Sequence, residues 1–223
     1  MSAIKERPIL FSAPMVRAIL EGRKTVTRRE VKKRAALDCL AAGFEPSFLA
    51  LPGNADLCPY GQPGDQLWVR ETFALFGNED GCCIDWQDNL VKGDERGAAR
   101  IYRASCPPGD YGLNQIPAKA EWKPDTEAME YDGAWRPSIH MPRWASRILL
   151  EITGVRVERL QDINRADIRA EGLQCPQELA SDDVSPNYKD WYPAAWRELW
   201  ESTGGDWDAN PWVWVVEFKR VTP

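Results

Sequence analysis

The stretch RILLEITGVRVERL, residues 147–160, alternates apolar and polar side chains as a long β-strand does. Gly154 interrupts the alternation and predicts a bulge or bend at that point. A second stretch, WVWVVEFKR at residues 212–220, predicts another strand near the end of the chain. Because side chains repeat every two residues along a strand, one face of this strand carries Trp212, Trp214, Val216 and Phe218.

The N-terminal part of the chain predicts a short strand, a helix and a second strand. Residues 9–11 are an apolar run, and Ser12 can cap a helix that has a proline in its first turn. Gly22 is a favourable stop for this helix. Further on, GQPGDQLWVRE at residues 61–71 combines turn-forming residues with an apolar run and predicts a turn followed by a strand.

Two further helices are expected before the last strand. Asn164 can cap a helix that continues through Ala170, and Gly172 is placed to end it. Pro193 opens the second helix, and helical spacing places three large apolar residues on one of its faces: Trp196, Leu199 and Trp200.

The predicted order of elements favours the α+β class. Short strands separated by turns and helices suit a small PUA-like mixed β-barrel with flanking helices, not a Rossmann sheet. We expect one domain over residues 1–223 with large loop insertions at about 31–60, 75–140 and 174–190, since these segments lack periodic apolar sequence for a core. Within them the pattern predicts only a short helix over Val31–Leu40 and a strand over Ile101–Ala104.

Composition indicates a globular chain without a membrane segment. The 223 residues are 43% hydrophobic, which is enough for a core, and no run of 18 apolar residues occurs. The N-terminus lacks the apolar region of a signal peptide, so we expect a cytoplasmic protein with no membrane partner. Six cysteines without a CxxC pair and the single His140 do not predict a metal site, and no cofactor is expected.

Charge is distributed unevenly along the chain. The net charge is −6, which does not favour bulk attraction to nucleic acid. Residues 1–35, however, hold ten Lys or Arg and three Glu, so this segment is +7 and the remainder is −13. A local basic face can hold a phosphate, although a solvated charge run is an equally simple interpretation. The eleven tryptophans are expected mainly in the core and loops, with one or two available to stack on a base.

The most basic stretch, EGRKTVTRR at residues 21–29, begins at the expected helix stop. A helix C-terminus carries partial negative charge, so Arg23 and Lys24 have a structural explanation as countercharges. Lys24 and Thr27 are three residues apart, which places them on one face of a helix but not of a regular strand. If the chain is extended beyond Gly22, a turn or bulge is needed to bring these two side chains together.

Several of these stretches together resemble the ASCH domain of the PUA-like superfamily. The resemblance rests on four stretches that cover less than half of the chain: LEGRKTVTRR (20–29), PGDQLWVRE (63–71), VRVERLQDINRADIRAEGL (155–173) and WVWVVEFKR (212–220). The segment WRPSIHMPRWASRI (135–148) is similar to longer bacteriophage and prophage members. The short bacterial members that this sequence resembles include N4-acetylcytidine amidohydrolases, and other members are RNA-binding proteins or ribonucleases.

The resemblance to the amidohydrolases implies a catalytic group of Lys24, Thr27 and Glu171. Amide hydrolysis needs a nucleophile, a base and a stabiliser of the oxyanion. A lysine can activate a threonine hydroxyl only if burial or nearby cations lower its pKa. The nearby cations are Arg23, Arg28 and Arg29. Glu171 can shuttle a proton or hold the lysine, but a nearby carboxylate raises the lysine pKa, so the two effects oppose each other.

Further residues are predicted to contact the substrate. Around the lysine they are Arg23, Thr25, Arg28 and Arg29. Arg70 and Glu71 follow the apolar run LWV, where a strand end can line a pocket or carry only a surface ion pair. His140 lies between two prolines and is either structural or placed to touch a phosphate or a base.

Three functions are open from the sequence. The first is hydrolysis of an N4-acylated cytidine-type nucleoside by Lys24, Thr27 and Glu171. The second is a module that binds RNA or a modified base without turnover, which the basic N-terminal segment and the tryptophans favour. The third is a ribonuclease whose acids are carboxylates such as Glu71 and Glu171. The expected partner is a nucleoside or RNA in each case, and the oligomeric state is open.

Overall fold

The computed structural model describes residues 4–54, 56–78, 82–93, 95–106, 135–176 and 191–221, and the chain divides into two compact units. The first unit consists of Met1–Arg7, Ala18–Leu67 and Leu149–Pro223, and the second of Pro8–Arg17 and Trp68–Ile148. The expectation of a single domain with insertions stays a prediction. Of the expected insertions, residues 107–134 and 177–190 lie outside the described part of the chain.

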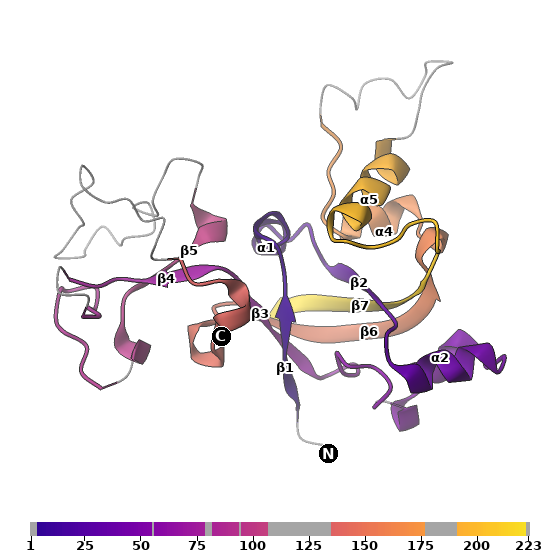
Figure 1. Cartoon of the computed structure of the whole chain (residues 1–223), viewed down its shortest axis with the longest axis horizontal. Coiled ribbons are helices and arrows are strands. Elements are labelled where there is room, and N and C mark those ends of the chain that lie inside the picture. The colour runs from indigo at the N-terminus through magenta and orange to yellow at the C-terminus, as the bar shows by residue number, and fades with distance from the viewer. Residues whose placement is uncertain are drawn as a thin grey trace. The chain divides into compact units, whose positions relative to one another are not determined.

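The main β-sheet has five strands in the order β1-β3-β6-β7-β2 (Figure 1). Their bounds are Glu6–Leu10 for β1, Val26–Glu30 for β2, Gln66–Arg70 for β3, Leu149–Arg159 for β6 and Trp212–Val221 for β7. This sheet and the helices confirm the α+β class. The expected barrel is not closed, because β1 and β2 form the two edges of the sheet and no ladder joins them within the described residues.

A helix end, not another strand, lies beside the chain where it enters β2. Lys24 forms an isolated bridge with Glu171, and the N–H group of Thr25 donates to the carbonyl of Ala170 at 2.8 Å. These contacts occupy backbone groups that a strand closing the barrel at this point would need.

The two long strands predicted from the alternating stretches are present, and they pair with each other. β6 and β7 run antiparallel over their full length, with a register shift between Ile152 and Gly154. The predicted bulge at Gly154 is therefore confirmed. A Cβ atom at this position would lie 2.8 Å from the carboxylate of Glu217, so the absence of a side chain lets Glu217 lie against the strand.

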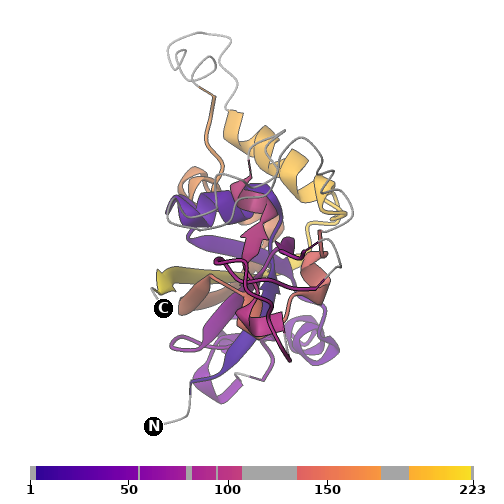
Figure 2. The same ribbon diagram turned by 90° about the vertical axis from the view of Figure 1, so that its left-hand side faces the viewer.

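Two helices, α4 (Arg165–Ala170) and α5 (Trp191–Ser202), pack together in the first unit (Figures 1 and 2). They cover one face of β2 and β7, where buried residues of both helices and both strands form one cluster: Val26, Leu160, Ile168, Tyr192, Trp196, Trp200, Val213 and Val215. α5 begins two residues before the predicted start at Pro193. A proline is tolerated there because the N–H groups of the first helical turn have no partner within the helix.

The three N-terminal helices are short. α1 (Ala13–Leu20) ends before Gly22 as predicted, and the φ angle of Gly22 is +75°. α2 (Arg34–Ala41) begins three residues later than predicted, since the N–H group of Val31 still donates to the carbonyl of Trp212 at 2.9 Å. α3 (Pro46–Leu49) follows. Within the described residues, no helix is both long and apolar enough to cross a membrane.

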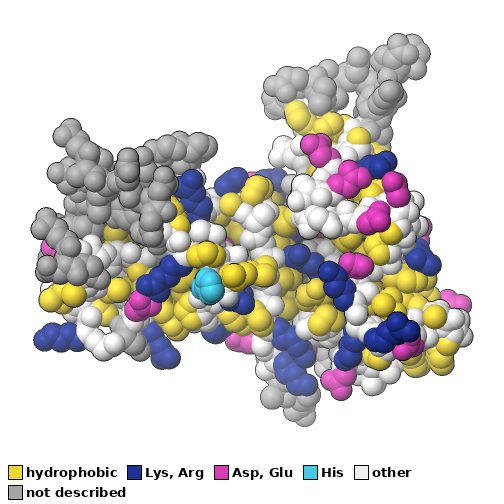
Figure 3. All heavy atoms as spheres, viewed as in Figure 1, with side chains coloured by type: hydrophobic (Ala, Val, Ile, Leu, Met, Phe, Trp, Pro, Cys, Tyr) yellow, Lys and Arg dark blue, Asp and Glu magenta, His cyan; other side chains and the backbone are white. Residues whose placement is uncertain are grey.

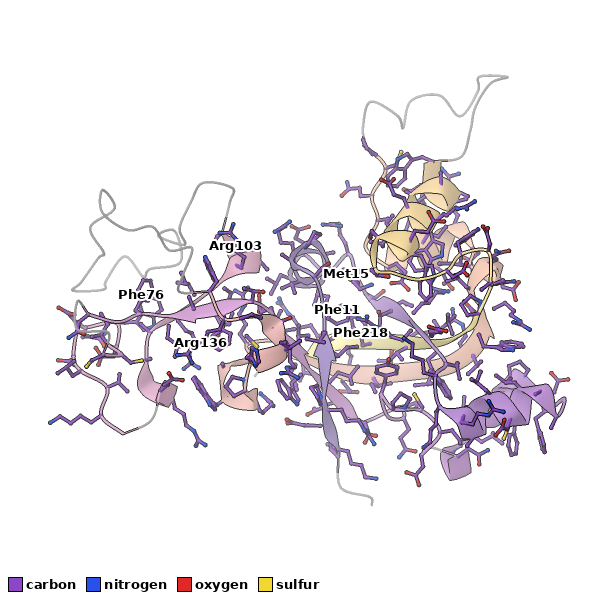
Figure 4. The ribbon with its side chains drawn as sticks, viewed as in Figure 1. Phe11, Met15, Phe76, Arg103, Arg136 and Phe218 are labelled. Atoms are coloured by element: carbon purple, nitrogen blue, oxygen red, sulfur yellow. The ribbon has the colours of Figure 1, made fainter. Side chains whose placement is uncertain are left out.

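In the second unit, β4 (Phe73–Leu75) and β5 (Arg100–Tyr102) form a two-stranded antiparallel sheet. The strand predicted at Ile101–Ala104 is present, but its last residues belong to a 3-10 turn at Arg103–Ser105. Figure 4 shows Phe76, Arg103 and Arg136 around these strands. The buried residues that pack against one another here are Ala74, Phe76, Ile84, Ala99 and Ile101. Other 3-10 turns span Pro52–Asn54, Glu95–Gly97, Ser138–His140, Arg143–Ala145 and Leu160–Asp162.

Candidate active site

Lys24 is positioned by the end of α1. The N–H groups of Arg23 and Lys24 both donate to the carbonyl of Ala18, at 2.9 and 3.0 Å, and the chain then runs extended into β2. Lys24 therefore belongs to no helix. Its spacing of three residues from Thr27 does not place the two side chains on a shared face.

Glu171 is positioned by the end of α4, as the residue that follows its last helical residue. Asn164 caps the start of this helix as predicted, and its side chain accepts from the N–H group of Asp167 at 2.9 Å. Gly172 then turns the chain with a φ angle of +96°. A Cβ atom on Gly172 would lie 3.1 Å from the Cβ atom of Lys24, so a glycine is required for the close approach of these two segments.

The side chains of Lys24 and Glu171 meet inside the first unit. Lys24 Nζ donates to Glu171 Oε2 at 2.5 Å, to the carbonyl of Glu171 at 3.0 Å and to the carbonyl of Val26 at 2.8 Å. The two side chains are only 0% and 3% exposed. An ammonium group carries three protons, so these three oxygens match its full donor capacity.

Burial lowers the pKa of Lys24, because removal from water disfavours the charged ammonium. The charge of Glu171 and its hydrogen bond raise this pKa, whereas the charges of Arg29 and Arg28 lower it further. The opposing effects predicted from the sequence are thus both present, and the net direction is downward because burial is the largest of them. A lysine with a lowered pKa can release its proton closer to neutral pH and then act as a base.

Arg28 connects Glu171 to two more carboxylates, and its side chain is fully buried. Arg28 Nη1 donates to Glu171 Oε1 at 3.3 Å, and Nη2 donates to Glu158 Oε1 at 2.6 Å and to Asp167 Oδ2 at 2.5 Å. The guanidinium also lies 5.9 Å from the centre of the Trp196 ring. Arg28 was predicted to contact substrate, but in this structure protein carboxylates engage it.

Arg156 joins the same group from β6 and is its partly exposed cation. Its guanidinium donates to Glu158 Oε2 at 3.1 Å, to Asp167 Oδ2 at 2.5 Å and to the carboxylate of Glu217. We define the charge cluster as Lys24, Arg28, Arg156, Glu158, Asp167, Glu171 and Glu217. Its three cations and four carboxylates come from β2, β6, β7 and α4 or the residues next to them.

Thr27 is separate from this cluster. It lies opposite Val216 in the regular pairing of β2 with β7 and is 2% exposed. Since side chains alternate along a strand, Thr27 points to the face opposite that of Arg28. Within the described residues, no hydrogen bond joins Thr27 to Lys24 or Glu171. The structure therefore brings together two of the three predicted catalytic residues, Lys24 and Glu171. A bulge in β2 would be needed to turn Thr27 toward them, but the register shift of this sheet lies in β6.

The other predicted contact residues of this segment have structural partners. Arg23 donates from Nη1 to the carbonyl of Gly172 at 2.6 Å and from Nε to Glu21 at 2.7 Å. Thr25 is exposed, and its backbone holds the end of α4. Arg29 lies opposite Trp214 in the β2–β7 pairing, on the same face as Thr27.

Acids from elsewhere in the chain match three of the ten cations in the basic N-terminal segment, whereas Lys32, Lys33 and Arg34 at the start of α2 are exposed. Asp65 pairs with Arg7 at 2.9 Å, Glu171 with Lys24, and three carboxylates with Arg28. In the space-filling view, Lys and Arg side chains stand over α2, and Asp and Glu side chains gather over α5 (Figure 3). Part of the basic segment is therefore neutralised by partners within the fold, and part of it is exposed at the surface.

The remaining predicted residues lie in the second unit. Glu71 is buried and accepts two hydrogen bonds from Arg147, at 2.9 and 3.0 Å. Burial raises the pKa of this carboxyl, although Arg147 lowers it in part. Arg70 donates to the carbonyl of Ser138 at 3.1 Å. His140 is exposed at the end of the 3-10 turn Ser138–His140.

Sequence reasoning missed Arg156, Glu158 and Asp167 as members of the charge cluster. The signal for the first two was present, since the alternation VRVER at residues 155–159 puts both polar side chains on one face of a predicted strand. That face also carries buried Val213 and Val215 on the paired strand, so polar residues there need partners.

Comparisons with known proteins leave the family of the chain open. No protein-family model matches the chain, and neither the search of curated proteins nor that of solved structures found a significant match. Within the described residues, no group of three or more His, Cys, Asp or Glu side chains is arranged to hold a metal ion.

Proposed function

We propose that the chain is an ASCH-family hydrolase that cleaves the amide bond of an N4-acylated cytidine-type nucleoside in the cytoplasm. The observation that supports this proposal is the buried contact between Lys24 Nζ and Glu171 Oε2, at 2.5 Å. A buried lysine with a lowered pKa beside a carboxylate can give up and take back a proton, as amide hydrolysis requires. These two residues match the lysine and the glutamate that the family resemblance implies.

In the proposed reaction, Lys24 acts as a neutral amine. It accepts a proton from a water molecule as the water oxygen bonds to the acyl carbon, because Thr27 lies on the face of β2 opposite to the cluster that holds Lys24. The tetrahedral intermediate then loses its C–N bond, and the ammonium of Lys24 returns the proton to N4 of the leaving cytidine. Glu171 stabilises the ammonium form of Lys24 between the two proton transfers.

The test is the release of cytidine and acetate from N4-acetylcytidine by the purified chain, followed by chromatography. We expect equal amounts of both products from the natural sequence. Glu171→Gln keeps the size of the side chain but removes its charge, and we expect it to lower kcat by about 100-fold or more. Lys32→Ala changes an exposed lysine of the same basic segment and serves as the control with full activity. No acetate above the protein-free rate would overturn the proposal.

Thr27 is tested by a pair of variants. Thr27→Ser retains a hydroxyl at a buried position, and Thr27→Ala removes it. If Thr27 is the nucleophile, the serine variant keeps activity and the alanine variant loses it. If water is the nucleophile, the two variants have similar activity. Thermal unfolding of both variants separates lost packing from lost chemistry.

A second candidate function is the binding of a modified nucleoside without turnover. The observation that favours it is that Lys24 Nζ donates to three oxygens of Val26 and Glu171, one for each proton of an ammonium group. This arrangement stabilises the protonated form of the lysine. A charged lysine has no lone pair to act as a base. Calorimetric binding of N4-acetylcytidine without any release of acetate would favour this function over hydrolysis.

A further inference from the structure

Glu171 is shared unequally between two buried cations. Lys24 Nζ lies 2.5 Å from Oε2, whereas Arg28 Nη1 lies 3.3 Å from Oε1. The side chains of all three residues are at most 3% exposed, so water does not screen these interactions as it would at the surface. The charge of one carboxylate is therefore divided between two positive groups.

Other contacts prevent Arg28 from moving closer to Glu171. Its Nε and Nη2 atoms donate to Glu158 Oε1, at 2.9 and 2.6 Å, and Nη2 also donates to Asp167 Oδ2. Glu158 lies on β6 and Asp167 on α4, so two different elements hold the guanidinium. Trp196 of α5 packs against it as well. The position of Arg28 is thus set by the fold and not by Glu171 alone.

We propose that Arg28 is a positioning residue for the Lys24–Glu171 pair. It holds Glu171 by the second oxygen and takes part of the carboxylate's charge, so that Glu171 does not fully neutralise Lys24. The effect of Arg28 on catalysis rests on the proposed hydrolase function. The effect of Arg28 on the protonation of Lys24 does not depend on whether the chain turns over a substrate.

The charged groups around Lys24 determine the direction of the expected effects. Glu171 favours the protonated lysine, and Arg28 and Arg29 disfavour it. Loss of Arg28 removes a positive charge and leaves Glu171 to Lys24 alone, so the lysine should keep its proton to higher pH. Loss of the negative charge of Asp167 frees Arg28 to approach Glu171, so the lysine should lose its proton at lower pH.

The direct test is the titration of Lys24 by NMR in the full chain, with lysine labelled by ¹³C at Cε and the Lys24 signal assigned from Lys24→Arg. We expect Arg28→Gln to raise the midpoint by about one pH unit and Asp167→Asn to lower it. Arg156→Gln is the matched control. Arg156 pairs with Glu158 and Asp167 but not with Glu171, so it should move the midpoint by less than half as much.

An unchanged midpoint in folded Arg28→Gln, or an equal shift in Arg156→Gln, would overturn the proposal. If Arg28→Gln does not fold, Asp167→Asn decides: a lowered midpoint supports the role of Arg28, and an unchanged one overturns it. The pH profile of kcat/KM for N4-acetylcytidine should shift in parallel. A shifted NMR midpoint in a chain that releases no acetate would support the positioning role and contradict only the hydrolase function.

Discussion

Two buried carboxylates, Glu171 in the first unit and Glu71 in the second, are paired with cations in different ways. Glu71 gives both oxygens to a single arginine, Arg147, whose side chain is 25% exposed. Glu171 gives one oxygen each to Lys24 and Arg28, whose side chains are fully buried. In a bidentate pair with one arginine at the edge of solvent, the carboxylate links no second cation to the first. A shared carboxylate couples the protonation of a buried lysine to every charge around it.

The largest expected effect comes from removal of each carboxylate. Glu171→Ala leaves two buried cations without this partner, so we expect it to lower the free energy of unfolding by about 3–5 kcal/mol. Glu71→Ala leaves one cation that can turn toward water, so a loss of about 1–3 kcal/mol is expected. Urea unfolding of the two variants measures the difference. Equal losses of unfolding free energy would contradict the idea that burial of the cations makes the Glu171 pairs more costly to break than the Glu71 pair.

A smaller effect is expected from the glycine that brings Glu171 to Lys24. Gly172→Ala places a residue with a side chain at a φ angle of +96° and a Cβ atom 2.9 Å from that of Ala18, and we expect a cost of about 2–3 kcal/mol. Gly22→Ala is the matched control, since Gly22 has a φ angle of +75° but open space around its Cβ position. Its cost should be the backbone strain alone, about 1 kcal/mol. A Gly22 variant as unstable as the Gly172 variant would show that packing against Lys24 and Ala18 is not decisive.

The two sites should also give opposite dependences of stability on pH. The folded pKa of Lys24 is lowered, so unfolding takes up a proton and stability rises with pH between that pKa and the usual value of 10.5. The folded pKa of Glu71 is raised, so folding takes up a proton and stability falls as pH rises from 4.5 through that pKa. Within each of these pH ranges, the free energy of unfolding changes by at most about 1.4 kcal/mol for each step of one in pH.

Urea unfolding across pH, with Lys24→Met and Glu71→Gln, isolates these two contributions. Lys24→Met should flatten the alkaline rise, and Glu71→Gln should flatten the acidic fall. If the alkaline rise in stability persists in Lys24→Met, or the acidic fall persists in Glu71→Gln, that pH dependence comes from another titratable group.

The smallest effect is expected at an exposed ion pair. Arg34 and Asp38 are one turn apart in α2 and their side chains are 88% and 59% exposed, so water competes with the interaction. Arg34→Ala should leave the unfolding midpoint unchanged in a thermal melt. A clear decrease would show that exposure is a poor guide to the strength of the pairs in this protein.

Most elements of the fold were predictable from local signals in the sequence. Period-two alternation predicted β6 and β7, Gly154 predicted the bulge between them, and Asn164 predicted the start of α4. Some errors lie at boundaries, as at α2, where Val31 continues to pair with Trp212, and two short elements, α3 and β4, were not predicted. The barrel was not predictable in this way, because closure depends on what lies beside β1 and β2 and not on the pattern within any strand.

The candidate site was predictable in part. The family resemblance of EGRKTVTRR and of the AEG sequence at residues 170–172 indicated Lys24 and Glu171, and in the structure Lys24 Nζ lies 2.5 Å from Glu171 Oε2. The same resemblance indicated Thr27, which lies on the other face of β2. The sequence placed Arg28 among the cations near Lys24, but it did not give the contacts of Arg28 with Glu158 and Asp167. Only its partners on β6 and α4 show that it is fully buried.

The sequence by itself determined where the chain turns, caps and alternates, because glycine conformation, capping side chains and side-chain period act over a few residues. It also determined which residues can carry charge. The tertiary structure alone decided which charges meet, since Lys24, Arg28, Glu158 and Glu171 are brought together from segments more than a hundred residues apart. It decided the direction of the Lys24 pKa as well, because burial, which outweighs the neighbouring charges, is a property of the packed fold.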